Sequence, residues 1–241
     1  MRFVDLHCHL LWALDDGCDT PDETLAAARL LVDLGFSDAA PSPHAVAGFA
    51  GGDPEQAEAR RAEAEALLRE KGVPLALHRN AENRLDAEFL ARAGGEARRG
   101  VGASERWVLL EVPFDAPVPA LPDLVFRLRR SGILPLFAHP ERCTEFERPG
   151  RAAEVVRLGA ALQLNVGALA GVYGKGPRRL AERLLDEGLY AVAATDLHRA
   201  AGADEWLGEA LVALDRRAGG EAIERLLASN PRRVLAGEEL T

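Results

Sequence analysis

At two places in the sequence, two potential metal ligands are separated by a single residue. His7 and His9 flank a cysteine near the amino terminus, and Asp196 and His198 flank a leucine much further along the chain. Because side chains alternate between the two faces of an extended chain, each pair presents both of its polar groups on one side. Imidazole and carboxylate groups without thiolates suit zinc, manganese or iron. A single His-x-His pair is as compatible with a packing role as with metal binding, so the interpretation depends on what else shares the pattern.

Five more side chains of these types stand at corresponding places in the chain. His44, Glu82, Glu111 and His139 each follow a short apolar run, and Asp16 lies in the loop after the first histidine pair. The nine nitrogen and oxygen donors are too many for one ion, so the sequence predicts two or three divalent ions with Glu111 as a bridging ligand. Such clusters perform hydrolysis by in-line attack, with one oxygen activated and the other stabilised as it leaves.

The apolar runs before these ligands alternate with segments of helical periodicity. Seven runs are predicted to be strands: Phe3–Leu6, Asp38–Ser42, Pro74–Leu77, Trp107–Val112, Leu134–Ala138, Ala161–Val166 and Tyr190–Thr195. Six segments with 3.6-residue apolar spacing are predicted to be helices: Asp22–Leu34, Pro54–Lys71, Asp86–Arg98, Pro119–Arg130, Pro177–Glu187 and Ala203–Leu214. This alternation predicts parallel strands joined by crossover helices. His78 belongs to a strand, and we expect it to be a core or inter-strand residue.

The distribution of polar residues distinguishes two architectures that share this alternation. An open doubly wound sheet gathers its ligand site at one crevice, whereas a barrel collects site residues from the ends of many strands around one rim. Nearly every predicted strand in this chain ends in a ligand-type residue. We therefore predict an α/β barrel that occupies residues 1–241 as a single domain.

Length, charge and cysteine content exclude several classes of protein. The chain has 241 residues, with 29 Lys and Arg against 38 Asp and Glu, which gives a formal charge of −9 and argues against an electrostatic nucleic-acid binder. No stretch approaches the roughly 20 apolar residues that span a bilayer, so we expect no membrane insertion. Three cysteines are too few and too odd in number for a disulfide framework, which fits a reducing compartment. These features predict a soluble cytoplasmic protein.

Several short motifs resemble the polymerase-and-histidinol-phosphatase (PHP) superfamily. The most specific are Asp15-Asp16-Gly17, His139-Pro140-Glu141-Arg142, and Asn165-Val166-Gly167 followed by Tyr173-Gly174-Lys175. Within the superfamily, the chain is most similar to the capsule-associated bacterial protein-tyrosine phosphatases, over essentially its whole length. The resemblance implies a distorted (β/α)7 barrel of the TIM type and a multinuclear centre with manganese as the expected metal. It also implies hydrolysis of phosphotyrosine in the tail of a bacterial tyrosine kinase that controls polysaccharide export.

Two arginines stand close to the predicted ligands. Arg142 comes three residues after His139, where a guanidinium could clamp phosphoryl oxygens with two hydrogen bonds. Arg199 follows the last ligand directly and is a second candidate. The alternative for Arg142 is a surface ion pair with Glu141 or Glu145, which would contribute little.

Other phosphatase and hydrolase classes lack their motifs in this sequence. A cysteine-based tyrosine phosphatase needs Cys-x5-Arg, but the required arginine positions hold Leu14, Thr24 and Pro149. No cysteine is therefore predicted to act as the nucleophile. An amidohydrolase normally has a metal-bridging lysine where Glu111 stands. The alternative that remains is a small-molecule phosphoesterase of the histidinol-phosphatase type, which would use the same metals on a different leaving group.

Overall fold

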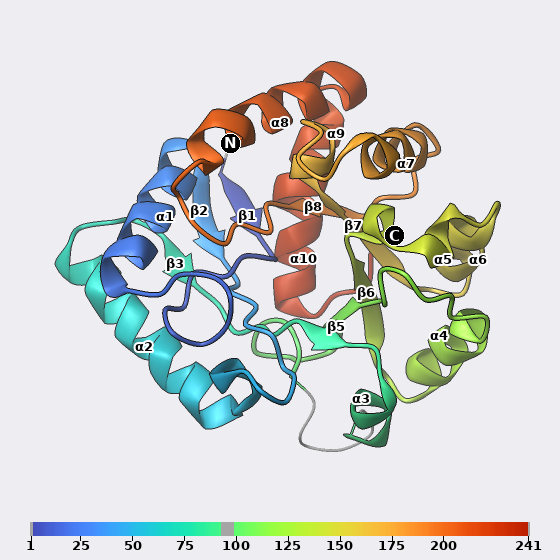
Figure 1. Cartoon of the computed structure of the whole chain (residues 1–241), viewed down its shortest axis with the longest axis horizontal. Coiled ribbons are helices and arrows are strands. Elements are labelled where there is room, and N and C mark those ends of the chain that lie inside the picture. The colour runs from blue at the N-terminus through green and yellow to red at the C-terminus, as the bar shows by residue number, and fades with distance from the viewer. Residues whose placement is uncertain (1, 93–98, 241) are drawn as a thin grey trace.

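Parallel strands alternate with helices throughout the computed structural model, which describes residues 2–92 and 99–240 (Figure 1). The strands are β1 (Phe3–Asp5), β2 (Phe36–Ala39), β3 (Ala76–Leu77), β4 (Asn83–Arg84), β5 (Trp107–Glu111), β6 (Leu134–Ala138), β7 (Ala161–Asn165) and β8 (Val192–Ala194). All seven predicted strands are present, with differences at their ends, and every strand pair is parallel. The parallel arrangement predicted from the alternation is confirmed.

Most of the helices lie around the outside of the strands, and the last one lies behind them in this view (Figure 1). They are α1 (Pro21–Asp33), α2 (Pro54–Glu70), α3 (Ala87–Arg92), α4 (Leu121–Arg130), α5 (Thr144–Glu147), α6 (Arg151–Arg157), α7 (Lys175–Asp186), α8 (Ala203–Ala218), α9 (Gly220–Glu224) and α10 (Asn230–Ala236). The six predicted helices correspond to α1 to α4, α7 and α8, although residues 93–98 of the predicted third helix lie outside the described residues. The other four were not predicted. Helices α5 and α6, of four and seven residues, are too short to show a periodic apolar face. Helices α9 and α10 are joined by a π-helical segment at Arg225–Ser229 into one continuous helical stretch, which the apolar pattern did not reveal.

Two sheets together make the ring of strands. One has the order β1-β2-β3 and the other the order β4-β5-β6-β7-β8. Isolated parallel bridges join the sheets at both junctions, one between Cys8 and Leu197 and one between His44 and Glu82. The α/β barrel fold predicted from the sequence is therefore confirmed, with a distortion where the two sheets meet.

Asp5 links the first strand of the ring to the last. Its buried carboxylate accepts hydrogen bonds from the backbone amide and the hydroxyl of Thr195 and from the backbone amide of His7. Burial raises the pKa of Asp5 to about 6, although these hydrogen bonds favour the ionised form. One side chain thus fastens β1 to the end of β8.

The junction between β3 and β4 contains the strand that sequence analysis missed. β4 has only two residues, which is too short for an alternating pattern. Asparagine side chains anchor this segment to its surroundings, since Asn80 donates to the carbonyl of Leu6 and Asn83 donates to the carbonyls of Ala81 and Leu109. The break turns the chain so that Glu82 reaches the interior of the ring.

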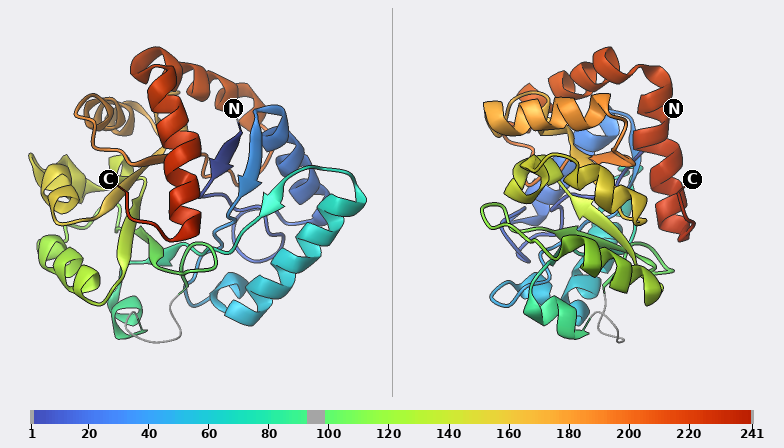
Figure 2. Two further views of the ribbon diagram at one scale, coloured as in Figure 1. Left: turned by 180° about the vertical axis from the view of Figure 1, so that it is seen from behind. Right: turned by 90° about the vertical axis from the view of Figure 1, so that its right-hand side faces the viewer.

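The side chains that face the interior of the ring change from apolar to polar along the strands. On β5 the inward row runs from Trp107 and Leu109 to Glu111, and on β7 it ends in Gln163 and Asn165. The helix α10 crosses the amino-terminal end of the strands, where it adds Val234 to the inner apolar cluster (Figure 2). One end of the ring is therefore filled with apolar side chains, and polar groups gather at the other.

None of the helices within residues 2–92 and 99–240 combines the length and apolar character needed to cross a membrane. This agrees with the absence of a long apolar run in the sequence.

Replacing Asp5 with alanine should destabilise the fold substantially. Three buried donors would lose their acceptor, and each unsatisfied donor costs about 1–3 kcal/mol, so we expect the free energy of unfolding to fall by about 3 kcal/mol or more. Urea unfolding at pH 8 in excess chelator measures this effect with the carboxylate ionised and without any contribution from bound metal. Asp33→Ala, at the exposed end of α1, should change the same quantity by less than about 0.5 kcal/mol. Equal effects of the two variants would show that Asp5 does not hold the ring together.

Candidate metal centre

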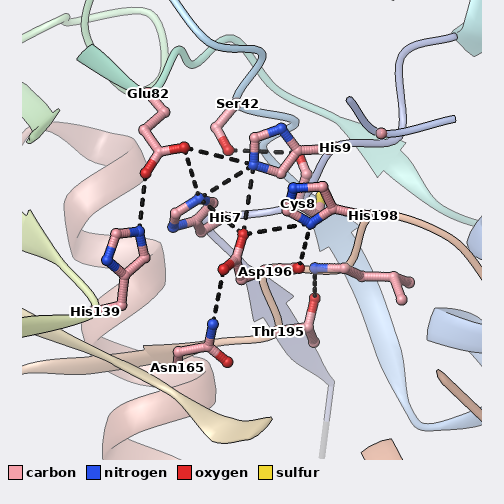
Figure 3. A network of polar contacts seen from close by, with 12 residues as sticks. His7, Cys8, His9, Ser42, Glu82, His139, Asn165, Thr195, Asp196 and His198 are labelled. Carbon is pink, nitrogen blue, oxygen red and sulfur yellow. Dashed lines mark hydrogen bonds and ion pairs between the residues drawn. The ribbon is translucent and has the colours of Figure 1, made fainter. Parts of the chain in front are cut away.

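Predicted ligands from opposite ends of the sequence meet inside the carboxyl-terminal rim of the ring (Figure 3). Nε2 of His7 lies 3.3 Å from both Oε2 of Glu82 and Oδ1 of Asp196. Nε2 of His9 lies 3.5 Å and 3.4 Å from the same two oxygens. All four side chains are buried. Two imidazoles and two carboxylates therefore share one enclosed space.

Glu82 connects this group to two further histidines. Its Oε1 atom lies 3.0 Å from Nε2 of His139, and its Oε2 atom lies 3.1 Å from Nδ1 of His44. Glu82 stands immediately before β4, and His139 follows β6. The carboxylate of Glu82 thus contacts four histidines that come from three different parts of the ring.

Asp16 forms the outer edge of the cluster. Its Oδ1 atom lies 3.4 Å from Nε2 of both His44 and His198. The preceding residue, Asp15, closes the local turn by accepting a hydrogen bond from the backbone amide of Gly17. A Cβ atom at position 17 would lie 2.2 Å from the carbonyl oxygen of His9, so only glycine fits there. The turn directs Asp16 toward the histidines.

Polar atoms other than the predicted ligand atoms hold three of the rings through Nδ1. The pairs are His7 with Oε1 of Gln163 at 3.0 Å, His9 with Oδ2 of Asp15 at 2.8 Å, and His198 with the carbonyl oxygen of Asp196 at 2.9 Å. In each ring Nε2 is left to face the shared space. Such outer hydrogen bonds are typical of metal-binding histidines, because they fix both the tautomer and the orientation of the ring.

The donor atoms are close enough together to hold divalent cations. Within the described part of the chain, three sets of ligand atoms each lie within 4.8 Å of one another: His9, Asp16, His44 and His198; His7, Glu82 and His139; and His7, His9 and Asp196. Imidazole and carboxylate are ligands that manganese, iron and zinc all accept. The residues present therefore fit a metal centre.

Opposite charges compensate the burial of these groups. Burial alone would lower the pKa of His7, but the carboxylates of Glu82 and Asp196 raise it to about 9. Burial would also raise the pKa of Glu82, whereas His7 and His139 hold it well below its usual range. The carboxylates consequently stay ionised in the interior, which is the form that binds cations.

Two of these residues have a left-handed backbone that non-glycine residues rarely adopt. His139 has φ of 31° and Asp196 has φ of 53°. Such conformations cost free energy and cluster at functional sites, where the surrounding structure maintains them.

Glu111 lies at the end of β5, at the edge of this cluster. It is partly exposed and lies outside the three compact sets of ligand atoms. Burial and the like charge of Glu82 raise its pKa, which places Glu111 within electrostatic range of the centre. Its role as a bridging ligand stays a prediction.

Arg142 lies beside the centre between two aromatic rings. Its Nη1 atom donates to Oδ2 of Asp196 at 3.1 Å. The guanidinium carbon lies 4.5 Å from the ring centroid of Phe114 and 4.4 Å from that of Tyr173. Asn165 holds this arrangement by donating to both Asp196 and the Tyr173 hydroxyl. The guanidinium is therefore fixed next to a predicted ligand.

Among the described residues, Arg142 forms neither of the alternative ion pairs, with Glu141 or with Glu145. Glu141 accepts hydrogen bonds from the amide of Asn165 and the hydroxyl of Tyr190, and Glu145 pairs with Arg148 and Arg151. Both carboxylates are buried.

Arg199 lies further out than Arg142. Its Nε atom donates to the carbonyl of Gly17, and its Nη2 atom lies 2.7 Å from Oδ2 of Asp19. These contacts fasten the segment after β8 to the first loop. The structure thus brings Arg142 to the cluster and holds Arg199 on the loop beside it.

The cysteines and the remaining histidine lie apart from this chemistry. All three cysteines are buried and free, and burial raises the pKa of Cys8, Cys18 and Cys143. A nucleophilic cysteine needs a lowered pKa, so their environments agree with the prediction that none acts as the nucleophile. His78 contacts Oδ1 of Asp38 on the neighbouring strand at 2.9 Å, as an inter-strand residue would.

Residues 3–236 match the sequence profile of a family described as capsular polysaccharide synthesis, CpsB/CapC. This chain belongs to the CpsB/CapC family. It is 28% identical to the tyrosine-protein phosphatase YwqE of Bacillus subtilis over 238 residues, which cover 98% of this chain and 93% of YwqE. It is also 25% identical to CapC of Staphylococcus aureus over 196 residues, which cover 81% of this chain and 76% of CapC.

Solved structures extend the comparison of this CpsB/CapC protein. A crystal structure from work on YwqE of Bacillus subtilis and CpsB of Streptococcus pneumoniae, described as metal-dependent tyrosine phosphatases, matches with a TM-score of 0.87 and 28% identity. The match covers 99% of this chain and 96% of the other. Histidinol phosphate phosphatase from Lactococcus lactis has a TM-score of 0.52 at 14% identity over 87% of this chain and 92% of its own, which shows a shared fold alone.

Several residues that organise the CpsB/CapC site were not identified as functional from the sequence. Asp15, Asn165 and Tyr173 lie in the motifs that carry the family resemblance, so their positions were visible but their roles were not. Gln163 precedes one of these motifs by two residues, and side-chain alternation with Asn165 was the available signal. No sequence pattern indicated a role for Phe114, because its contacts depend on the path of the loop after β5.

Removing the carboxylate of Asp15 should weaken metal binding. Asp15 orients His9 through Nδ1, and loss of such an outer partner typically lowers metal affinity about 10- to 100-fold. We expect that range for Asp15→Ala when Mn²⁺ is titrated in competition with a chromophoric chelator. Asp22→Ala, on the exposed first turn of α1, is the matched control and should leave the affinity unchanged. Indistinguishable affinities for the two variants would contradict the orienting role of Asp15.

Proposed function

We propose that this protein is a metal-dependent phosphatase that hydrolyses phosphotyrosine. The observation that carries the proposal is a cluster of imidazoles and carboxylates with a fixed guanidinium at its edge, in a CpsB/CapC chain. Structural agreement with metal-dependent tyrosine phosphatases, at a TM-score of 0.87 over nearly the whole chain, supports the same conclusion.

The ligand side chains would hold two or three divalent ions, with manganese expected and iron or zinc also fitting the donors. The residues concerned are His7, His9, Asp16, His44, Glu82, Glu111, His139, Asp196 and His198. Ions in such a site supply a water of lowered pKa and neutralise phosphoryl charge. The protein's own contribution is to hold these donors in fixed orientations, with His7, His9, Glu82, His139 and Asp196 buried from bulk water.

Arg142 binds the phosphoryl group in this proposal. Asp196 accepts a hydrogen bond from one of its nitrogens, Phe114 and Tyr173 pack against the guanidinium, and its other nitrogens would contact the substrate. A rigid planar donor of this kind suits the tetrahedral oxygens of a phosphate ester. Arg199 would act on the substrate only by leaving its contacts with the first loop.

The proposed natural substrate is a phosphotyrosine in the tail of a bacterial tyrosine kinase, within capsular polysaccharide synthesis. The family and the names of its relatives supply the biological context. Chemistry supports the leaving group, because tyrosine's phenol has a pKa near 10 and departs more readily than an alkoxide. The formal charge of −9 disfavours acidic peptides in general, so a positive site at Arg142 and the ions would govern their binding.

Relative activity on three substrates tests this function. With Mn²⁺ present, we expect kcat/KM for a phosphotyrosine peptide to exceed that for a phosphoserine peptide and for histidinol phosphate by at least about tenfold, or 1.4 kcal/mol. Excess chelator should abolish the activity, and Mn²⁺ should restore it. A variant with Cys8→Ser, Cys18→Ser and Cys143→Ser should keep its metal-dependent activity. Preference for histidinol phosphate by the same factor would replace the proposal with the small-molecule alternative.

Arg142→Ala should lower kcat/KM for the phosphotyrosine peptide by about a hundredfold, the effect of removing one charged donor from a developing negative charge. Arg142→Lys should restore little, because an ammonium group cannot stack between Phe114 and Tyr173 with the same geometry. Metal content of the variants, measured by elemental analysis, controls for damage to the centre. Full activity of Arg142→Ala with intact metal content would remove this residue from the site. The same measurement of kcat/KM on Arg199→Ala tests Arg199, the second candidate for binding the phosphoryl group.

A further inference from the structure

Two exposed phenylalanines stand at the rim of the candidate metal centre. Phe49 is 39% exposed and Phe114 is 38% exposed. Phe49 belongs to the loop between β2 and α2, and Phe114 belongs to the loop between β5 and α4. Both loops follow the carboxyl ends of strands, which is the face where barrel enzymes bind their substrates.

Each of these rings packs on a different histidine of the centre. Phe49 stacks on His44 with ring centroids 5.4 Å apart and an interplanar angle of 24°. Phe114 lies against His139, also at 5.4 Å, with an angle of 55°. Both histidines contact the carboxylate of Glu82, one at each oxygen. Each phenyl ring therefore packs, from its own loop, on a histidine that contacts Glu82.

Two other exposed apolar side chains lie on outer helices, away from this rim. Phe126 lies on the outer helix α4 beside Arg130, and Val212 lies on the outer helix α8. Isolated exposed residues of that kind are ordinary on protein surfaces. Phe49 and Phe114 are different, because they are exposed aromatic rings that pack on predicted ligand histidines. Small-molecule sites combine such apolar walls with a few fixed polar groups.

We propose that Phe49 and Phe114 form two walls of a slot that binds the phenyl ring of an aryl phosphate ester. The inference rests on the proposed phosphatase function and makes these residues determinants of its specificity. With the phosphoryl group at the ions and Arg142, the substrate ring lies between the loops after β2 and β5. Aromatic rings stabilise one another there by stacking or edge-to-face contact, which an alkyl phosphate such as phosphoserine cannot provide.

Phe49 gives the cleaner test, because Phe114 also supports Arg142. We expect Phe49→Ala to lower kcat/KM for phenyl phosphate and for a phosphotyrosine peptide at least tenfold more than it lowers kcat/KM for β-glycerophosphate. Phe49→Tyr keeps a flat ring and should recover most of the loss. Phe126→Ala removes an equally large exposed ring from α4 and should leave kcat/KM unchanged for both the aryl and the alkyl substrates. A loss shared equally by aryl and alkyl substrates, or no loss at all, would overturn the slot.

Binding of non-hydrolysable ligands separates the slot from the reaction itself. The unmodified protein loaded with Mn²⁺ should bind phenylphosphonate at least tenfold more tightly than methylphosphonate in calorimetry, and Phe49→Ala should remove most of that preference. Affinity for inorganic phosphate and bound metal content should stay unchanged in the variant. If the protein hydrolyses no phosphate ester, the proposed function fails, and the phosphonate comparison still decides the slot. Equal affinities for the two phosphonates would overturn it.

Discussion

A buried carboxylate in contact with four histidines is stable only when positive charge surrounds it, and Glu82 is in that position. The same residue pairs through its backbone with His44 at the junction of the two sheets. Charge compensation and closure of the strand ring therefore occur at one place. Any change that moves β4 away from β2 would separate Glu82 from the imidazoles and leave a buried charge without compensation, which is strongly unfavourable.

Much of the architecture was accessible from sequence because its signals are local. Period-2 and period-3.6 apolar patterns are set by neighbouring residues, so the alternation of strands and helices predicted a parallel α/β barrel correctly. The strand-end positions of His7, His9, His139 and Asp196 likewise predicted that these side chains would meet. By contrast, β4 is too short to leave a pattern, and the contacts of Asn80 and Asn83 beside it reach residues far away in the sequence.

The parts of the site that escaped prediction are contacts made by loops. Gln163 was hidden because its orientation of His7 joins residues 156 positions apart, which no local pattern records. Phe49 and Phe114 depend on the paths of two loops, whereas the ligands depend on strand ends. This division agrees with the behaviour of barrel enzymes, whose strands form a common scaffold while the loops at their carboxyl ends vary with the molecule that is bound. The structure shared with histidinol phosphate phosphatase at 14% identity thus says little about the substrate.

The clasp between Asp5 and Thr195 also constrains how the protein is made. The two residues are 190 positions apart, so at about 5–20 residues per second the ribosome needs roughly 10–40 s to supply the second after the first. During that interval β1 has no partner on its β8 side, and the amino-terminal histidine pair has no Asp196 opposite it. Long-range closures of this kind also slow folding, since the entropy of ordering the intervening chain is lost before the contact forms. The set of predicted ligands is consequently complete only after Asp196 and His198 have been synthesised, so the geometry that would bind cations belongs to the closed ring and not to its amino-terminal part alone.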